Sequence, residues 1–154
     1  MSVISDFVDV IEARLSSVAG VSVIVPTRQA GDAIDDKTVT IKTRDVEELP
    51  EFDRPGNPPA IGKMLPVAVT GLVIPSELAA TPTPFHEAAA DLGTSCQNAI
   101  TSPVNWHTFG GNSIDAIVGP LAFIEPDDEE PGAFQFTIQI KYRVDETDHN
   151  NLRA

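Results

Sequence analysis

Cysteine and basic residues are scarce in this sequence. Cys96 is the only cysteine among 154 residues, which excludes an internal disulfide framework, and a single thiol fits a reducing compartment. Ten lysines and arginines stand against 23 aspartates and glutamates, giving a formal net charge of −13 at pH 7. A surface with this charge repels nucleic-acid phosphates and anionic lipid headgroups at long range. We therefore expect the protein not to capture DNA or a membrane surface.

Long apolar runs are missing as well. No run approaches the roughly 20 residues that a membrane-spanning helix needs. The first residues include Asp6, Asp9 and Glu12, where a secretory signal peptide would be basic and then purely apolar. These absences predict a soluble protein made in a cytoplasm. With 42% hydrophobic residues the chain can fill one core, so we predict a single domain over residues 1–145 and a flexible tail at 146–154.

Groups that catalysis or metal binding would need are few and scattered. His86-Glu87 begins like the zinc motif H-E-x-x-H, but Ala90 occupies the position of the second histidine. Cys96 has no basic neighbour in sequence and lies on the apolar stripe of a predicted helix, which favours a buried structural role. Residues 127–130 resemble a calcium-binding loop only in charge. We predict that the protein is not an enzyme and holds no metal ion or cofactor.

Hydrophobic periodicity predicts two helices and five strands. The first helix covers residues 3–19 and ends at Gly20; the second covers 83–100, where Thr83 can cap and Pro84 suits the first helical position. The strands are predicted at 21–25, 38–43, 66–74, 114–125 (interrupted at Gly119-Pro120) and 134–144. The order α-β-β-β-α-β-β indicates an α+β fold, with a mostly antiparallel sheet of about five strands and both helices packed on one face.

The last predicted strand alternates strictly between apolar and polar residues. The side chains expected to face the helices are Phe134, Phe136, Ile138, Ile140, Tyr142 and Val144. The opposite, outer face is expected to present Gln135, Thr137, Gln139, Lys141 and Arg143. Because the rest of the protein is strongly acidic, we interpret this uncharged-to-basic face as a surface for a partner.

Residues 44–65 are predicted to form a long loop without regular structure. Loops of this length are usually functional or disordered. Pro55, Pro58 and Pro59 stiffen the segment, which lowers the entropy lost if it docks on a neighbour. A second loop, at 105–113, contains Trp106 and a glycine pair. We interpret this second loop as a cover over the open end of the core, with a ligand pocket as the alternative.

A ring of identical subunits would account for the polar strand face, the stiff loop and an acidic hairpin tip at 126–132. Candidate residues for contacts with a neighbouring subunit or a tube are Arg54, Pro55, Asn57, Pro58, Pro59, Gln135, Thr137, Gln139, Lys141 and Arg143. Candidates for an acidic lumen or tube-facing surface are Glu47, Glu48, Glu51, Asp53, Asp127, Asp128, Glu129 and Glu130.

The order of these features carries a family resemblance over about residues 3–145. It consists of the opening helix ending in Gly20, the strand VSVIV, a Pro-Pro loop before an apolar strand, a second helix, a W-x-x-F-G-G loop and a closing strand ending in K-Y-R. In this order of elements and motifs the chain resembles the tail terminator (tail completion or neck) proteins of long-tailed bacteriophages. The proline-rich loop and the C-terminal tail depart from the family pattern.

The resemblance implies a structural virion protein that forms a ring, expected to be a hexamer, at the head-proximal end of the tail tube. Such a ring ends tube polymerisation and joins the tail to the head. Its partners would be the tail tube protein and a head-side connector or stopper protein, in the tail-neck region of a virion assembled in the host cytoplasm. DNA would pass through the lumen without specific binding.

Three alternatives remain open from the sequence. Two are structural phage parts of related fold, a head-tail connector adaptor and a tail tube subunit. The third is a small-ligand binding module that uses residues 106–112.

Overall fold

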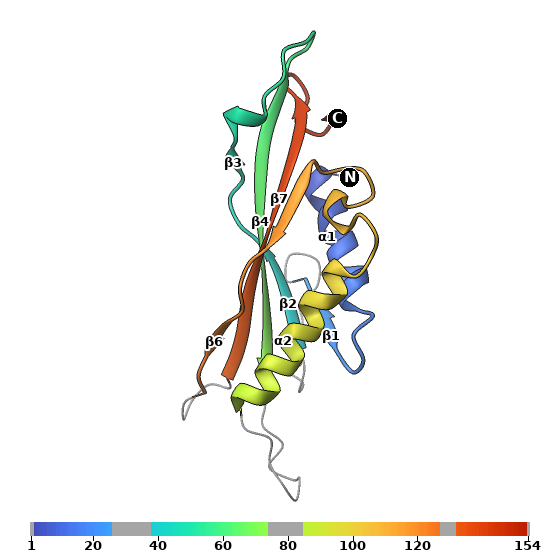
Figure 1. The fold of residues 1–154 in the computed structure, drawn as a ribbon. Helices are drawn as coiled ribbons and strands as arrows, with labels where there is room; N and C mark the ends of the chain where they lie inside the picture. The colour runs from blue at the N-terminus through green and yellow to red at the C-terminus, as the bar shows by residue number, and fades with distance from the viewer. Residues whose placement is uncertain (1, 26–37, 74–84, 127–131, 154) are drawn as a thin grey trace, which may run out of the picture.

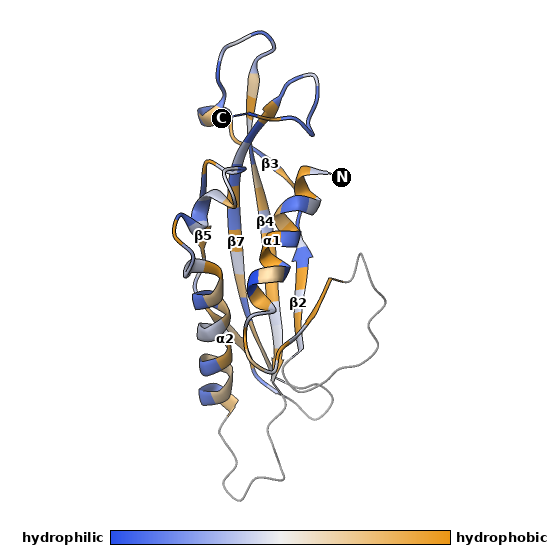
Figure 2. Cartoon of the chain, turned by 90° about the vertical axis from the view of Figure 1, so that its right-hand side faces the viewer, coloured by the Kyte–Doolittle hydropathy of each residue, from blue (hydrophilic) through white to orange (hydrophobic). Residues whose placement is uncertain are grey.

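Two α-helices lie side by side on one face of a β-sheet in the computed structural model, which describes residues 2–25, 38–73, 85–126 and 132–153 (Figures 1 and 2). The helices are α1 (Val3–Leu15) and α2 (Phe85–Thr101), and two short 3-10 helices are η1 (Pro50–Phe52) and η2 (Trp106–Thr108). The strands are β1 (Ser22–Ile24), β2 (Thr38–Thr43), β3 (Glu47–Glu48), β4 (Ala60–Val73), β5 (Asp115–Val118), β6 (Ala122–Ile124), β7 (Gly132–Asp145) and β8 (Leu152–Arg153).

The sheet has eight strands in the described residues and is mixed. Its main path is β1-β2-β4-β7-β5, while β3 pairs with β4 and both β6 and β8 pair with β7. β1 and β2 run parallel, and the other pairs are antiparallel. The α+β class is confirmed, but the predicted five-stranded, mostly antiparallel sheet and its strand order are wrong. Two-residue strands such as β3 and β8 are too short to show any periodicity, so the sequence pattern could not reveal them.

The core lies between the helices and the inner face of the sheet. All six side chains of β7 that were predicted to face inward are buried. Their cross-strand partners on β4 include Leu65 opposite Ile140 and Val67 opposite Ile138, and all four are fully buried. From α1, Phe7 and Ile11 complete this layer with no exposed surface. The hydroxyl of Ser2 accepts a hydrogen bond from the Ser5 amide at 3.1 Å and so caps α1. The helix ends at Leu15 and not at residue 19.

Strands β4 and β7 form one long antiparallel ladder that projects beyond both helices (Figure 1). We call this end of the ladder and the segments packed on it, residues 47–64 and 141–153, the arm. The prediction that residues 44–65 lack regular structure is wrong, because β3, η1 and the first part of β4 lie there. Residues 60–65 pair along their whole length with β7, from Ala60 opposite Asp145 to Leu65 opposite Ile140. The continuous partner strand therefore extends β4 beyond its apolar run.

The C-terminal residues also belong to the arm. Strand β8 pairs with the end of β7, with Leu152 opposite Val144 and Arg153 opposite Arg143. Residues 146–153, predicted to be a flexible tail, therefore fold back onto the domain. They cover the edge of β7 at the arm and leave its outer face uncovered at residues 135–139, where Gln139 is exposed and Gln135 and Thr137 are half-buried.

Candidate interaction surfaces

Hydrogen bonds fix the base of the arm around a single glycine. The Gly62 amide donates to Asp53 Oδ1 at 2.7 Å, and the Gly62 carbonyl accepts from the Leu49 amide at 2.9 Å. A side chain at position 62 would collide with η1, because an added Cβ would lie 2.6 Å from Phe52 Cβ. Lys63 Nζ, on the same strand, lies 3.1 Å from Glu48 Oε1. These contacts seat β3 and η1 against β4.

Phe52 forms the centre of a cationic cluster on the outer face of the arm. Arg143 Nε donates to the Phe52 carbonyl, and the Arg143 Cζ atom lies 5.9 Å from the centre of the Phe52 ring. Lys141 Nζ lies 5.5 Å from the same ring centre. Burial, and then the nearby charge of Arg54, lower the pKa of Arg143. The prediction that Arg143 lies on an open face is therefore wrong: η1 covers it, and Lys141 is half-buried.

The proline-rich tip is tied to the C-terminal segment. Arg54 and Ala60 close the loop through two backbone hydrogen bonds of 3.0 Å. The Glu146 amide donates to the Pro59 carbonyl at 2.9 Å, and Arg153 Nη1 contacts the Pro58 carbonyl at 3.4 Å. Arg153 also pairs with Asp145, a carboxylate that is largely buried. The tip thus presents exposed residues on a fixed base, and these are Arg54, Pro55, Asn57 and Pro59.

The acidic candidates divide into two sets with different environments. Glu48 and Asp53 hold the arm together through the contacts described above. Glu47 and Glu51 are exposed on the same part of the chain. The run Asp127, Asp128, Glu129 and Glu130 lies outside the described residues, so the structure places only the arm carboxylates.

Two shallow grooves mark the outer face of the sheet. The first, about 560 Å³, is lined by Ile117, Gly119, Pro120, Ala122, Gln135, Phe136, Thr137 and Gln139. The second, about 570 Å³, is lined by Lys42, Thr43, Arg44, Asp45, Glu47, Pro66 and Thr137. Thr137 lies between them and contributes to both. The first groove therefore brings together three predicted interface residues, which are Gln135, Thr137 and Gln139.

The loop at 105–113 closes the core, as the first interpretation of it expects. Phe109 is fully buried, and its ring meets the edge of the Phe7 ring at a centroid distance of 6.0 Å. Arg14 Nη1 donates to the carbonyls of Ile100 and Trp106, each at 3.1 Å. Burial lowers the pKa of Arg14. The Arg14 guanidinium therefore fastens the loop to the end of α2.

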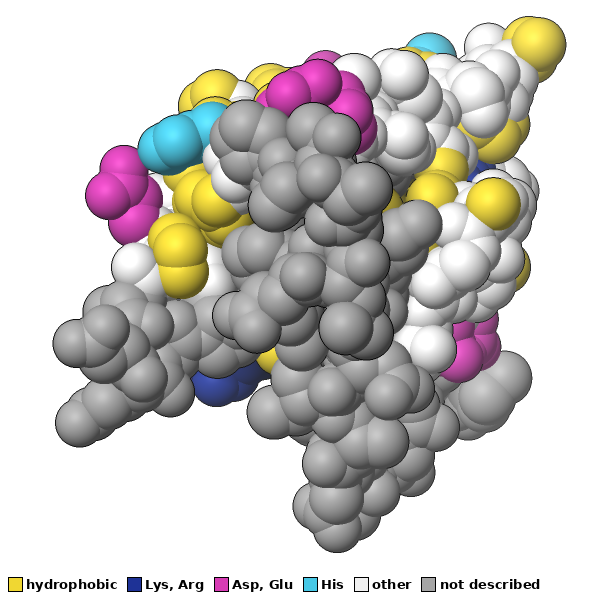
Figure 3. All heavy atoms as spheres, turned by 90° about the horizontal axis from the view of Figure 1, so that it is seen from below, with side chains coloured by type: hydrophobic (Ala, Val, Ile, Leu, Met, Phe, Trp, Pro, Cys, Tyr) yellow, Lys and Arg dark blue, Asp and Glu magenta, His cyan; other side chains and the backbone are white. Residues whose placement is uncertain are grey.

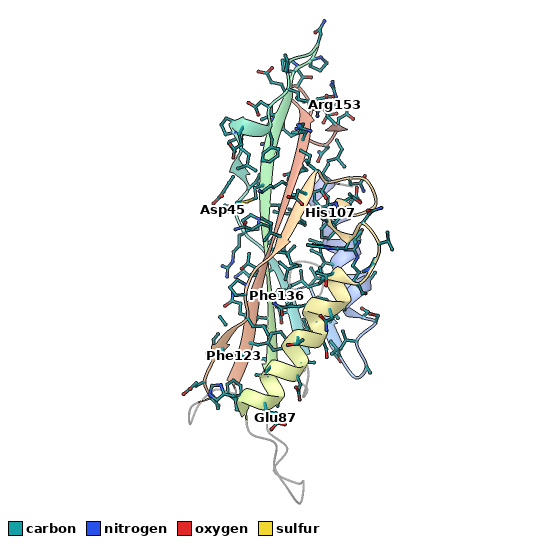
Figure 4. The ribbon with its side chains drawn as sticks, in the orientation of Figure 1. Asp45, Glu87, His107, Phe123, Phe136 and Arg153 are labelled. Carbon is teal, nitrogen blue, oxygen red and sulfur yellow. The ribbon has the colours of Figure 1, made fainter. Side chains whose placement is uncertain are left out.

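The end of the molecule opposite the arm carries a small ring cluster. His86 meets Phe85 and Phe123 at centroid distances of 5.3 and 5.9 Å, and its Nε2 lies 3.1 Å from Glu125 Oε1. Seen from below, hydrophobic side chains lie beside a histidine at this end (Figure 3), and Phe123 and Glu87 lie far from Arg153 (Figure 4). Across residues 2–25, 38–73, 85–126 and 132–153, no three histidine, cysteine or acidic side chains converge as metal ligands.

Cys96 is fully buried in the core, and burial raises the pKa of its thiol from 9.0 to about 11. The folded state disfavours the thiolate, so ionisation of Cys96 favours the unfolded chain. The stability that the buried neutral thiol contributes is therefore fully present below pH 9 and is lost as the pH rises toward 11. We expect the Cys96→Ala variant to lose about 1 kcal/mol less of its unfolding free energy between pH 8 and pH 10 than the unsubstituted protein.

Urea denaturation of both proteins at the two pH values measures this difference. Burial also raises the pKa of Tyr142, to about 12, with a smaller effect from Glu48. Tyr142 is present in both proteins, so its effect cancels in the comparison. An equal change in unfolding free energy between the two pH values for both proteins would show that Cys96 does not ionise on unfolding in this range.

The sequence interpretation missed several residues that build the arm. Gly62, Phe52, Asp145 and Arg153 were not among the candidates. Gly62, Phe52 and Arg153 each contact a candidate residue, and Asp145 pairs with Arg153. An isolated glycine inside a strand often marks a close approach of another backbone, but Gly62 lies in the segment that was predicted to be a loop, so this signal could not be used.

No protein-family model matches this sequence, and no curated protein is significantly similar to it. Among the described residues, no helix is long and apolar enough to cross a membrane.

Proposed function

We propose that this protein is a structural component of a bacteriophage tail, a tail terminator that forms a ring at the head-proximal end of the tail tube. The observation that carries the proposal is the arm, a braced extension that rises beyond the helix-covered core and ends in an exposed proline-rich tip (Figure 1). A pre-ordered arm loses little entropy when it docks on a neighbouring subunit or on a tube.

The charge of the chain supports the same function. Six copies would carry about −78 formally, from −13 each. A lumen lined with carboxylates repels DNA phosphates, so a genome can pass through without binding. Glu47 and Glu51, both exposed, are the described carboxylates that we assign to the lumen or the tube-facing surface. We propose no catalytic step and no cofactor for this protein.

Electron microscopy of the purified, concentrated protein tests the proposal against its nearest alternatives. A terminator should give closed rings of uniform diameter, alone or on the ends of tail tubes. A tail tube subunit should instead polymerise into long tubes, and a connector adaptor should bind the head-side connector but not cap tubes. A small-ligand binding module should form none of these assemblies.

Replacing residues 54–60 with a flexible Gly-Ser linker should weaken ring formation or tube attachment at least tenfold. The tip would lose its fixed shape, and ordering a flexible linker at the contact costs entropy. Light scattering over a concentration series measures the change, and circular dichroism checks that the subunit is still folded. Assembly at the original concentration would show that the tip makes no contact.

A further inference from the structure

Two short strands, β5 and β6, form one edge of the sheet. Among the described strands both pair with β7 alone, and the Gly119-Pro120 interruption separates them. Figure 2 shows β5 at one side of the sheet, followed in order by β7, β4 and β2. The edge of β5 and β6 that lies away from β7 is therefore not paired with any described strand. Such an edge is a template for pairing with another chain.

In β5, the backbone of Val118 faces this open edge. The Gly119 amide donates to the Thr137 carbonyl at 2.8 Å, so residue 119 directs its amide toward β7. Backbone amides and carbonyls of successive residues in a strand point to opposite sides, and Val118 comes directly before Gly119 in the same register. The amide and carbonyl of Val118 therefore point away from β7.

The same alternation exposes the backbone of Phe123 in β6. Because Thr137 directs its carbonyl toward β5, Gln135, two residues earlier on β7, faces the same side. Gln135 lies opposite Ala122, so the residues of β6 that face β7 are Ala122 and Ile124. The amide and carbonyl of Phe123, between these two, point toward the open edge.

Apolar side chains line the edge on both faces of the sheet. Ile117 and Ile124 lie on the outer face and are 47% and 50% exposed. Phe123 lies on the helix face, is 40% exposed and meets the His86 ring at 5.9 Å. The first groove, which has no charged residue in its lining, runs beside the edge at Ile117 and Ala122. An added strand would therefore find apolar contacts on both of its faces.

Carboxylates bound the edge at its two ends. None of residues 116–124 is charged, whereas Asp115 precedes this stretch and Glu125 follows it, and both are exposed. Lys141 lies opposite Asp115 in the register, and Glu125 Oε1 lies 3.1 Å from His86 Nε2. In a chain of net charge −13, these ends attract a segment that carries basic residues at its own ends.

We propose that the β5–β6 edge binds an extended segment of a basic partner protein, which adds to the sheet as a further strand. The backbone of an extended segment supplies partners for the amides and carbonyls of Val118 and Phe123. Its alternate side chains contact the exposed isoleucines on one face and Phe123 on the other, so its centre is uncharged and its ends are basic. The site lies within one subunit, so this inference goes beyond the proposed function and does not depend on ring formation.

A synthetic peptide of alternating valine and threonine with a lysine at each end is the probe. Fluorescence anisotropy of the labelled peptide at low ionic strength measures its binding to the full chain. We expect the lysine-ended peptide to bind at least tenfold more tightly than the same peptide with a glutamate at each end. Equal affinities, or no binding of the lysine-ended peptide, would overturn the proposal.

Two substitutions of Phe123 separate the backbone contact from the side chain. Phe123→Pro removes the amide that faces the open edge, whereas Phe123→Val keeps it, and both remove the ring. Because this amide does not face β7, we expect both variants to keep the sheet, which circular dichroism checks. The proline variant should bind the peptide at least tenfold more weakly than the valine variant. Equal binding by the two folded variants would show that the segment does not pair at this edge.

Hydrogen exchange of the unsubstituted protein locates the contact without any substitution. The peptide should slow exchange of the Val118 and Phe123 amides and leave that of the Gly119 amide, which faces β7, unchanged. Protection confined to other strands would overturn the proposal. Self-association that Phe123→Pro abolishes and Phe123→Val preserves would also overturn it, because the occupant would then be a second copy. Peptide binding at this edge by a protein that forms no ring, alone or with tail tubes, would reject the proposed function and leave this inference standing.

Discussion

Substitution of Gly62 by valine should release β3 and η1 from the arm and reduce ring assembly at least tenfold. Valine favours strands, so any loss must come from the site and not from intrinsic propensity. An added Cβ would lie 2.6 Å from Phe52 Cβ and 3.1 Å from the Phe52 carbonyl carbon. These neighbours cannot move without breaking the hydrogen bond that the Gly62 amide donates to Asp53 and the one that its carbonyl accepts from the Leu49 amide. We expect the free energy of unfolding to fall by about 2–3 kcal/mol.

Hydrogen exchange and urea denaturation measure the two parts of this effect. Amides of residues 47–62 should exchange faster, while those of α1 and the core strands should keep their order of protection. Gly56→Ala at the arm tip is the control. A Cβ added at Gly56 would lie 3.2 Å from its nearest neighbour, the Pro58 carbonyl oxygen. Unchanged exchange in the Gly62→Val protein would contradict the description of the arm as a clamped unit.

Substitution of Phe7 by alanine should lower the free energy of unfolding by about 3–5 kcal/mol. Phe7 is fully buried and joins three parts of the chain: it lies on α1 and meets the edges of the Tyr142 ring at 5.3 Å and the Phe109 ring at 6.0 Å. A cavity there would loosen α1 from both β7 and the loop at 105–113. Because small domains are stable by only about 5–15 kcal/mol, the loss is a large share of the total.

Urea denaturation followed by circular dichroism gives this value directly. The control is Ile117→Ala, at a side chain that is 47% exposed, and we expect it to change the unfolding free energy of the isolated subunit by no more than about 0.5 kcal/mol. A loss of less than about 1 kcal/mol for Phe7→Ala would mean that α1 is not part of the cooperative core.

The sequence correctly predicted the features that depend on residues close together in the chain. The alternation of β7 placed six side chains in the core, and Gly119-Pro120 interrupted the predicted strand between β5 and β6. The Gly119 amide still donates to the Thr137 carbonyl at 2.8 Å, so the interruption preserves the pairing with β7. In each case residues close in sequence decide the outcome.

The arm could not be predicted from the sequence because contacts between residues far apart in the chain create it. Residues 60–64 become strand only because β7 continues beside them, and the partners of Glu48 and Asp53 lie across the β3–β4 turn. Arg143 alternates correctly yet is buried, since η1 folds over the outer face at that point. The parallel direction of β1 and β2 is likewise absent from the local pattern.

The molar mass of the purified protein in solution tests the central claim most directly. Light scattering across a concentration series should reach a plateau near 98 kDa, about six times the 16.4 kDa of the chain, and should not rise further. A plateau at another closed ring size would change only the stoichiometry. A mass of one chain at every concentration, with no capping of tail tubes, would contradict the account, as would a mass that grows without limit.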